Sequence, residues 1–319
     1  MLKRPGVLHG GVGTIPALRK MVLAEYPDAK FNEVLGRRFS EDEIIAFLQD
    51  CDCAISGGDI ISDRVLTALP HIRNIGFFGV GLNTVDLHAC RRHGVKLGYR
   101  AGANRISVAE LALSYMIAGL RWVTPLSLAM RQGERPSIRV GRNLTGRKVG
   151  LHGCGHIGKE VVRMLKPFGC EIFVHDIRDY PDFYREHAVK PVSFDELLAV
   201  SEVLSLHIPH TRKTHHVYDE KALAKLRPDC VLVNTCRGGV VDEEALLQRL
   251  ESGALAAACF DVFEIEPATN DRLLAHPNLL STPHIGASTD ESRIAMAATA
   301  LAGLKNGLTA DASEFEDYL

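Results

Sequence analysis

The sequence predicts an α/β protein made of two domains, each with a parallel β-sheet covered by helices. The length of 319 residues is about twice the ~150 residues expected of one domain. Short apolar runs alternate with segments of helical periodicity, and this alternation starts again after Arg147. Strands that alternate with helices pair in parallel and become buried on both faces.

The composition is typical of a globular protein. Hydrophobic residues make up 46% and charged residues 24%, which argues against a disordered chain, a collagen or a disulfide scaffold. The net charge of −2 provides no overall basic field, so we expect neither nucleic acid nor a membrane as a partner. Eight scattered cysteines and an N-terminus without an apolar run predict reduced thiols and a cytoplasmic location.

The first domain is expected to alternate between strands and helices up to about residue 97. The expected strands are 6–9, 31–34, 53–56, 75–78 and 95–97, and the expected helices are 15–25, 41–48, 63–69 and 85–92. A segment at 107–131 then predicts one long helix or two. The strands expected in the second domain are 149–152, 171–175, 203–207, 230–234, 256–260 and 279–281.

A glycine-rich run, Gly153-Cys154-Gly155-His156-Ile157-Gly158, follows the strand 149–152 and opens a helix. Gly153 would permit the tight turn, Gly155 the close approach of a pyrophosphate, and Gly158 the packing of helix on strand. Such glycines can also serve packing alone, but the strand–turn–helix context favours a dinucleotide site. Asp176 ends the next strand, 23 residues after Gly153. Its carboxylate suits the ribose hydroxyls and repels a 2′-phosphate, so NAD is expected rather than NADP. Arg178 argues the other way, because a guanidinium nearby could accommodate that phosphate.

A second glycine run, Gly11-Val12-Gly13, also follows an expected strand. Pro16 occupies its third glycine position, where it suits a helix start but provides no close packing. We interpret this run as a tight turn and expect a single nucleotide site.

Three polar residues follow consecutive strands of the second domain. Arg237, Glu266 and His284 come after the strands 230–234, 256–260 and 279–281. The carboxyl ends of parallel strands form the edge where open α/β sheets bind ligands. Reduction of a 2-oxo acid needs a cation for the carboxylate, a proton donor for the carbonyl oxygen and a partner that keeps the donor charged. Each residue alone has an ordinary structural explanation; His284, for example, is one of 14 histidines in the chain. Their joint placement after consecutive strands favours catalysis.

Several motifs resemble those of the D-isomer-specific 2-hydroxyacid dehydrogenases. The long ones are 153–158, 234–243, 261–267 and 282–289, and the short ones are 79–81, Asn104 with 107–111, and 205–209. The resemblance extends from Ile55 to Arg293, and the motifs around Arg237 and His284 are the most specific.

The resemblance implies a Rossmann NAD-binding domain inserted into a flavodoxin-like substrate domain. Residues 1–100 and 289–319 would form the substrate domain, and residues 101–288 the NAD-binding domain. The segment 104–135 resembles the dimerisation element of the family, so a homodimer is implied. Some members carry a further C-terminal regulatory domain, and this chain is similar to the short form without it.

The resemblance also implies residue roles. Arg237 would bind the substrate carboxylate and polarise the oxo group, with the backbone amides of Val80 and Gly81 beside that carboxylate. His284 would exchange the proton, and Glu266 would favour the protonated form of His284. The implied NAD contacts, with Asp261 near the nicotinamide amide, are Gly153, Gly155, His156, Ile157, Gly158, Asp176, His207, Pro209, Thr235, Cys236, Asp261 and Gly286. No metal site is implied.

The chain departs from the family pattern at several positions. His156 stands where arginine is frequent, His210 where an apolar residue is usual, and 98–101 replaces a more usual Asn-Thr-Pro run. The loop Gly57-Gly58-Asp59 lacks the basic residues of phosphoglycerate-type members, and Asp59 would oppose a phosphate if it faced the substrate. We therefore expect glyoxylate-like or hydroxypyruvate-like substrates rather than 3-phosphohydroxypyruvate.

Two classes of function remain open. The first is an NAD-dependent oxidoreductase that acts on the CH–OH group of a small D-2-hydroxy acid. The second is a non-enzymatic NAD-sensing protein similar to transcriptional corepressors, which can retain the same three polar residues. A formate-type enzyme is disfavoured because Glu266 stands where those enzymes have glutamine.

Overall fold

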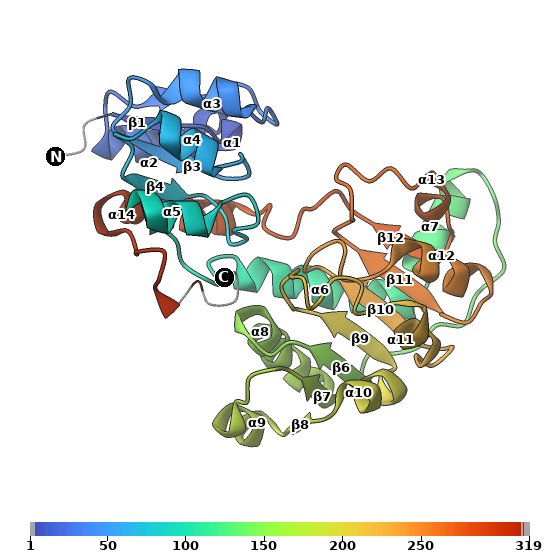
Figure 1. Cartoon of the computed structure of the whole chain (residues 1–319). Coiled ribbons are helices and arrows are strands. Elements are labelled where there is room, and N and C mark those ends of the chain that lie inside the picture. The colour runs from blue at the N-terminus through green and yellow to red at the C-terminus, as the bar shows by residue number, and fades with distance from the viewer. Residues whose placement is uncertain (1–3, 314, 316–319) are drawn as a thin grey trace. The chain divides into compact units, whose positions relative to one another are not determined.

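The computed structural model describes residues 4–313 and 315 and divides into two compact units (Figure 1). One unit comprises the residues up to Asn104 together with those from Ser288 onward, and the other spans Arg105–Ala287. The boundaries expected from the sequence, at 100/101 and 288/289, differ from these by four residues and by one.

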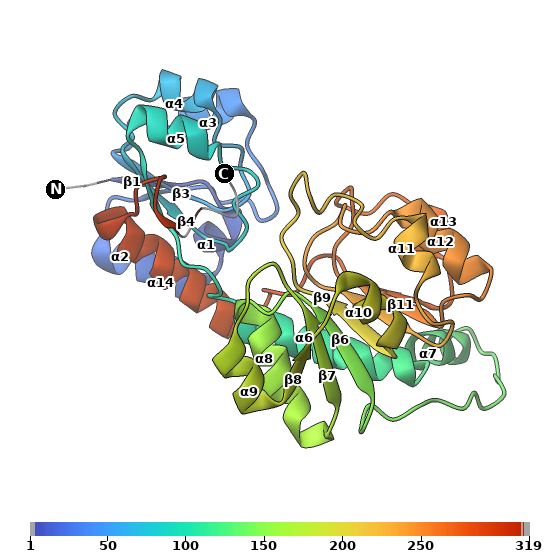
Figure 2. The same ribbon diagram turned by 60° about the horizontal axis from the view of Figure 1, so that its bottom comes forward.

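The first unit contains a five-stranded parallel sheet in the order β2-β1-β3-β4-β5, the flavodoxin-like order. Its strands are β1 (Pro5–Val7), β2 (Lys30–Phe31), β3 (Cys53–Ser56), β4 (Asn74–Phe77) and β5 (Lys96–Gly98). Its helices are α1 (Gly10–Thr14), α2 (Pro16–Glu25), α3 (Glu41–Leu48), α4 (Asp63–Ala68), α5 (Leu87–His93) and α14 (Asp290–Asn306). Helices α3, α4 and α5 cover one face of the sheet, and α2 and α14 cover the other (Figure 2).

Helix α14 packs directly on β4 and β5. A Cβ atom on Gly98 would lie 2.4 Å from the Cα of Gly303, and one on Gly76 would lie 2.3 Å from the carbonyl oxygen of Ala300. Side chains cannot fit at such distances, so glycine is required where the helix crosses these strands. The C-terminal part of the chain thereby completes the first unit.

The second unit contains a seven-stranded parallel sheet in the order β12-β11-β10-β9-β6-β7-β8. Its strands are β6 (Lys148–His152), β7 (Glu171–His175), β8 (Val189–Pro191), β9 (Val203–Leu206), β10 (Val231–Asn234), β11 (Ala257–Phe260) and β12 (Leu279–Ser281). Its helices are α6 (Arg105–Leu120), α7 (Val123–Arg131), α8 (His156–Leu165), α9 (Pro181–His187), α10 (Phe194–Val200), α11 (Glu220–Ala224), α12 (Glu243–Glu251) and α13 (Asp271–Leu274), with a 3-10 turn at Lys166–Phe168. The first six strands have the Rossmann order, and β12 extends the sheet.

Two hydrophobic clusters cover the two faces of this sheet. Residues of α6, α8 and α9 pack on one face, and residues of α10, α11 and α12 pack on the other. The segment 107–131, expected as one helix or two, forms two helices that are bent by 71° at their junction. No single helix in the described part of the chain is long and apolar enough to span a membrane, although α6 and α7 together pass that criterion as a bent pair.

Two local features differ from the sequence-based expectations. The tight turn expected at Gly11–Gly13 is wrong, because Gly10–Thr14 form the short helix α1. A Cβ atom on Gly10 or Gly13 would lie 2.1 or 2.0 Å from the carbonyl oxygens of Val34 and Asn32, so this run does provide close packing. Strand β8 was not expected, since it has three residues and ends in proline.

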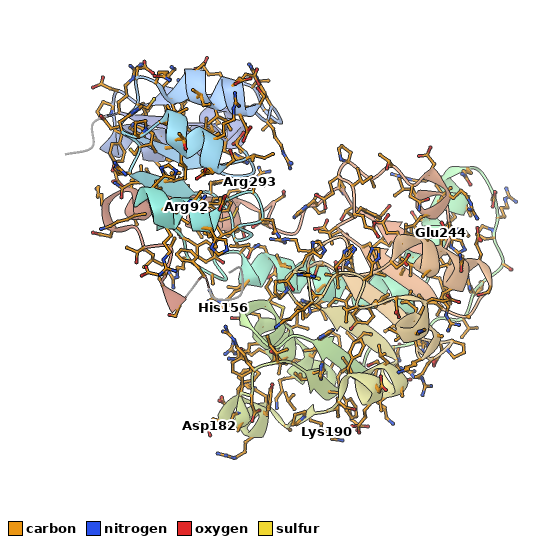
Figure 3. All side chains as sticks on the ribbon, in the orientation of Figure 1. Arg92, His156, Asp182, Lys190, Glu244 and Arg293 are labelled. Atoms are coloured by element: carbon orange, nitrogen blue, oxygen red, sulfur yellow. The ribbon has the colours of Figure 1, made fainter. Side chains whose placement is uncertain are left out.

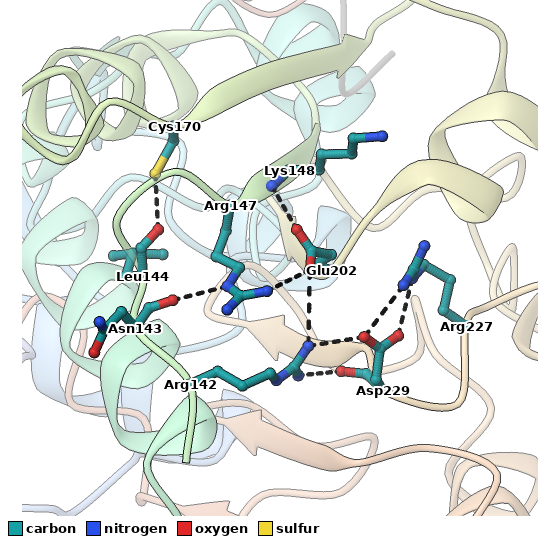
Figure 4. A network of polar contacts seen from close by, with 9 residues as sticks. All are labelled: Arg142, Asn143, Leu144, Arg147, Lys148, Cys170, Glu202, Arg227 and Asp229. Carbon is teal, nitrogen blue, oxygen red and sulfur yellow. Dashed lines mark hydrogen bonds and ion pairs between the residues drawn. The ribbon is translucent and has the colours of Figure 1, made fainter.

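The amino ends of β6, β9 and β10 are held together by a polar network (Figure 4). Glu202 accepts hydrogen bonds from Arg147 at 2.8 Å and from the backbone amide of Lys148 at 3.0 Å. Arg142 pairs with Asp229 at 2.9 Å. Burial would raise the pKa of Glu202, but these amide and guanidinium partners hold it below its usual value. This network fixes the edge of the sheet that lies opposite the carboxyl ends of the strands.

Candidate active site

The glycine run 153–158 forms the turn between β6 and α8. Gly153 has a φ of +98°, and a Cβ atom there would lie 2.4 Å from the carbonyl oxygen of His207. A Cβ atom on Gly158 would lie 2.2 Å from the carbonyl oxygen of Gly153. A Cβ atom on Gly155 would meet no atom within 4 Å. Gly153 and Gly158 are therefore required by the fold, whereas Gly155 leaves open space at the amino end of α8, where an anion is stabilised.

Asp176, at the end of β7, is hydrogen-bonded to this turn. Its carboxylate accepts hydrogen bonds from the backbone amides of Cys154 and of Arg178, the latter at 2.9 Å. His156 is exposed at the start of α8 (Figure 3), and Ile157 is partly buried against the core beneath the helix. The sequence-predicted dinucleotide residues of the glycine run and Asp176 thus lie together at the carboxyl ends of β6 and β7.

The loops after β9 and β10 contain two buried polar atoms that have no hydrogen-bond partner among the described residues. These are Nδ1 of His207 and Oγ1 of Thr235. The other ring nitrogen of His207 bonds Ser205 at 3.0 Å, and burial lowers the pKa of His207 to about 3, so the ring is neutral. An unsatisfied buried polar group costs roughly 1–3 kcal/mol, so a ligand that supplies partners gains affinity. Together with the open space at Gly155, these atoms fit a dinucleotide.

Cys236 is packed rather than exposed. Its amide donates to the side-chain oxygen of Asn234 at 3.1 Å, and burial raises the pKa of the Cys236 thiol to about 11. The Asn234 amide group in turn donates to the carbonyl oxygen of Arg237 at 3.1 Å. Asn234 was not singled out from the sequence, although it begins the motif that contains Arg237. It shapes the loop that presents the arginine.

His284 and Glu266 form a direct pair, with His284 Nδ1 lying 2.7 Å from Glu266 Oε2. The second carboxylate oxygen of Glu266 accepts the backbone amide of Phe263 at 3.2 Å. Burial alone would raise the pKa of Glu266, but the hydrogen bond and charge of His284, the Phe263 amide and the charge of Arg237 hold it below its usual value. Because an ionised carboxylate only accepts, Nδ1 of His284 carries a hydrogen, and Nε2 remains for proton exchange with a ligand.

Asp261 holds the turn that contains His284. Its carboxylate accepts the backbone amides of Ile285 and Gly286, both at 2.7 Å, and the hydroxyl of Thr282. His284 has a φ of +56°, and its own amide donates to the backbone carbonyl of Asp261 at 2.8 Å. Asp261 therefore serves first as a support for the turn, and its contact with a nicotinamide amide stays a prediction.

The first unit carries Val80 and Gly81 in the loop after β4, where the carbonyl oxygen of Val80 accepts the hydroxyl of Tyr99 at 3.1 Å. Asp59 is buried, and its carboxylate accepts the backbone amide of Phe39 at 3.1 Å. Asp59 therefore supports its loop from within and does not face a ligand. Arg38 lies over the same loop, with its Nε 3.9 Å from the position of a Cβ atom on Gly58. The loop Gly57-Gly58-Asp59 has no basic residue of its own, but the Arg38 side chain places a positive charge beside it.

This arrangement defines the class of the protein. An open parallel sheet carries a dinucleotide turn at the carboxyl ends of its strands, and a histidine–carboxylate pair with a nearby arginine follows other strands of the same sheet. These parts suit an oxidoreductase that uses a nicotinamide dinucleotide.

The comparisons identify the family. The family model described as the D-isomer specific 2-hydroxyacid dehydrogenase NAD binding domain matches residues 113–286. The hydroxypyruvate reductase of Thermotoga maritima is 34% identical over 268 residues, which cover 82% of this chain and 86% of that protein. A D-3-phosphoglycerate dehydrogenase of Arabidopsis thaliana is 35% identical over 316 residues, 94% of this chain, and the chain spans 50% of its length. A crystal structure of a glyoxylate reductase from Paecilomyes thermophila has a TM-score of 0.84 and 28% identity, with 96% of this chain and 95% of that chain covered.

The chain belongs to the D-isomer-specific 2-hydroxyacid dehydrogenase family. It is an NAD-dependent oxidoreductase that acts on the CH–OH group of D-2-hydroxy acids. The fold class and cofactor expected from the sequence are confirmed.

Proposed function

We propose that this enzyme interconverts a small 2-oxo acid and its D-2-hydroxy acid, with Arg237, Glu266 and His284 as the catalytic residues. The observation that carries the proposal is the 2.7 Å pair between His284 and Glu266, next to the charge of Arg237. Such a set supplies the proton donor, the group that keeps the donor charged, and the cation for a carboxylate.

Each of these residues has a proposed task. When bound, NAD supplies or accepts the hydride. In reduction, His284 donates its Nε2 proton to the substrate oxygen, and in oxidation neutral His284 takes that proton back. Ionised Glu266 favours the protonated ring in the first direction and stabilises the imidazolium formed in the second. The guanidinium of Arg237 binds the substrate carboxylate with two parallel hydrogen bonds and polarises the oxo group.

The proposed NAD contacts are those expected from the sequence. Gly155, His156 and Ile157 would face the pyrophosphate, and Asp176 the adenosine ribose. His207, Pro209, Thr235, Cys236 and Gly286 would line the remainder of the dinucleotide site. The orphaned Nδ1 of His207 and Oγ1 of Thr235 support this assignment, because each needs a partner that the described protein residues do not supply.

We propose glyoxylate or hydroxypyruvate as the substrate, with the amides of Val80 and Gly81 beside its carboxylate. The reductases among the relatives support this choice. The preference over 3-phosphohydroxypyruvate stays a prediction, but repulsion of the phosphate by Asp59 no longer supports it. Buried Asp59 does not oppose a phosphate directly, and Arg38 places a cation over Gly58.

We also propose a cytoplasmic homodimer that associates through the segment 104–135. Helix α7 exposes Val123, Leu128 and Met130, the last with 70% of its surface accessible. Several exposed apolar side chains gathered on one short helix favour an interface there. The cytoplasmic location rests on the eight free cysteines, seven of them buried.

The proposal is tested by NADH oxidation with glyoxylate, hydroxypyruvate, pyruvate and 3-phosphohydroxypyruvate. We expect turnover of the first two, and Arg237→Lys should raise KM and lower kcat because lysine lacks the planar fork. An absence of turnover with every 2-oxo acid, together with tight NADH binding, would favour the corepressor-like alternative. Wild-type kinetics in Arg237→Lys would contradict the role of the guanidinium.

A further inference from the structure

His216 shares an unusual backbone conformation with the catalytic His284. The φ of His216 is +48°, and few other non-glycine residues in the described ranges are left-handed. This conformation is unfavourable for a residue with a side chain, and it persists only where its surroundings impose it. The surroundings here include the carbonyl oxygen of Gly239, which accepts the backbone amide of His216 at 2.7 Å.

The imidazole of His216 reaches a different loop. Its Nε2 lies 2.9 Å from Oε1 of Glu264, and both side chains are about two-thirds buried, with 32% and 34% exposed. The backbone amide of Glu264 donates to Glu243 at 2.6 Å, at the start of α12. His216 therefore joins the loop after β10 through its backbone and the loop after β11 through its side chain.

These two loops carry the proposed catalytic residues. Arg237 precedes Gly238, where a Cβ atom would lie 1.9 Å from the carbonyl oxygen of Phe263, so the loops touch backbone to backbone. Phe263 precedes Glu264, and its amide donates to Glu266 at 3.2 Å. A displacement of Glu264 would thus move the amide that orients the Glu266 carboxylate.

Two further histidines complete the cluster around His216. The ring of His215 stacks on that of His216 with centroids 4.0 Å apart, and His215 Nδ1 lies 3.2 Å from His210 Nε2. His210 also stands against Gly239, where a Cβ atom would lie 3.0 Å from its ring. The loop 210–216 is therefore packed along the Arg237 loop over several residues, and His216 bonds Glu264 directly.

We propose that His216 is a positioning residue for this active site, which holds the Arg237 and Glu266 loops at the spacing that the reaction requires. His216 touches neither the substrate nor the reacting atoms and acts through Gly239 and Glu264. The proposal rests on the catalytic roles proposed for Arg237 and Glu266.

The test uses His216→Gly in the full-length protein. Glycine adopts a φ of +48° without strain, so this change removes the imidazole and keeps the backbone conformation. We expect kcat to fall about 10- to 100-fold, the effect of misplacing catalytic groups by about 1 Å, while the affinity for NADH and the Tm change little. His216→Gln should keep most of the activity, because the glutamine amide nitrogen can occupy the position of Nε2 and donate to Glu264.

Ala188→Gly is the matched control. Ala188 ends α9 with a φ of 54°, so glycine relieves the same strain at a position that carries no proposed catalytic role. We expect wild-type kinetics for this variant. A loss in Ala188→Gly equal to that in His216→Gly would overturn the proposal, because relaxing the backbone anywhere in the unit would then suffice.

Two further measurements separate positioning from general stability. The double variant His216→Gly/Glu264→Ala should lose no more activity than the more affected single variant, whereas additive losses would overturn the coupling. Hydrogen–deuterium exchange of apo His216→Gly should be faster at the amides of 261–267 and unchanged at 153–158. Wild-type kcat with unchanged exchange at 261–267 would overturn the proposal. If the wild-type enzyme reduced no 2-oxo acid, the proposed function would fail, and the exchange measurement would still decide the role of His216.

Discussion

His284 stands in a backbone conformation that a histidine ordinarily avoids, and its neighbours impose that conformation. Asp261 holds the adjoining amides of Ile285 and Gly286, and Glu266 fixes the imidazole. The ring therefore loses little further freedom when a substrate binds, which is the advantage of a preorganised site.

Replacing His284 with alanine should lower kcat by a factor on the order of 10²–10⁴, the usual contribution of a positioned acid–base group. The affinity for NADH should change little, because the His284 side chain is not among the proposed dinucleotide contacts. Steady-state kinetics and fluorescence titration with NADH measure the two quantities. A variant that keeps kcat within a few-fold of the wild-type value would show that another group donates the proton.

Glu266→Gln should change the pH dependence of reduction. The Glu266 pKa lies below its usual value, so the carboxylate is ionised at neutral pH and favours the protonated form of His284. Glutamine keeps the shape and loses the charge that favours the protonated ring. The pH above which kcat/KM for reduction falls should therefore move downward. A profile that overlays that of the wild-type enzyme would contradict the role of this charge.

At the scale of elements, the glycine turn shows how far a sequence pattern predicts geometry. The roles of Gly153 and Gly158 could be predicted, because a left-handed turn and a close crossing both exclude side chains. The pattern failed at Gly13, where the close partner is the carbonyl oxygen of Asn32. Such close approaches depend on tertiary packing, and no local signal reports them.

Gly155→Ala should chiefly weaken NADH binding, whereas Gly158→Ala should chiefly lower the stability of the fold. Alanine at 155 meets no protein atom within 4 Å, but the ψ of −148° there lies outside the main regions for a residue with a side chain, so the Tm should fall slightly. NADH should bind about tenfold or more weakly because the methyl group blocks the pyrophosphate. Alanine at 158 would strike the carbonyl oxygen of Gly153, so the protein should be destabilised by about 1–3 kcal/mol. Thermal unfolding and NADH titration measure both. Tight NADH binding by Gly155→Ala would place the pyrophosphate elsewhere.

The strand-end residues could be predicted for a simple reason. Parallel strands present their carboxyl ends at one edge, so Arg237, Glu266 and His284 were expected together from their order alone. The positions of Arg38 and Asp59 could not be predicted, because Arg38 reaches a loop twenty residues away and Asp59 turns inward to a backbone amide. His216 was missed because nothing in its local sequence indicates the pair with Glu264.

At the scale of the whole molecule, the chain leaves its first unit after Asn104 and returns to it at Ser288. After this return, helix α14 packs on the sheet of the first unit, with Gly303 against Gly98 in β5. The inserted unit contains the complete histidine–carboxylate pair and the glycine turn. That the first unit serves as the substrate domain, beside the NAD-binding second unit, stays a prediction.

The proposed homodimer predicts a mass twice that of the chain. Leu128 and Met130 on α7 are exposed apolar side chains, so Leu128→Asp/Met130→Asp should bury unpaired charges in the interface and yield monomers. Light scattering after size-exclusion chromatography measures the mass. Arg185→Asp, on exposed α9, serves as a charge-matched control that should remain a dimer. A double variant that stays dimeric would place the interface on another surface.

The account as a whole is tested most directly by the stereochemistry of the product. The enzyme is incubated with hydroxypyruvate and NADH, and the glycerate is resolved by chiral chromatography, with His284→Ala in parallel. We predict D-glycerate in an amount equal to the NADH consumed, formed at a rate that falls at least 100-fold in the variant. L-Glycerate, or D-glycerate formed as fast by His284→Ala as by the wild-type enzyme, would contradict the account.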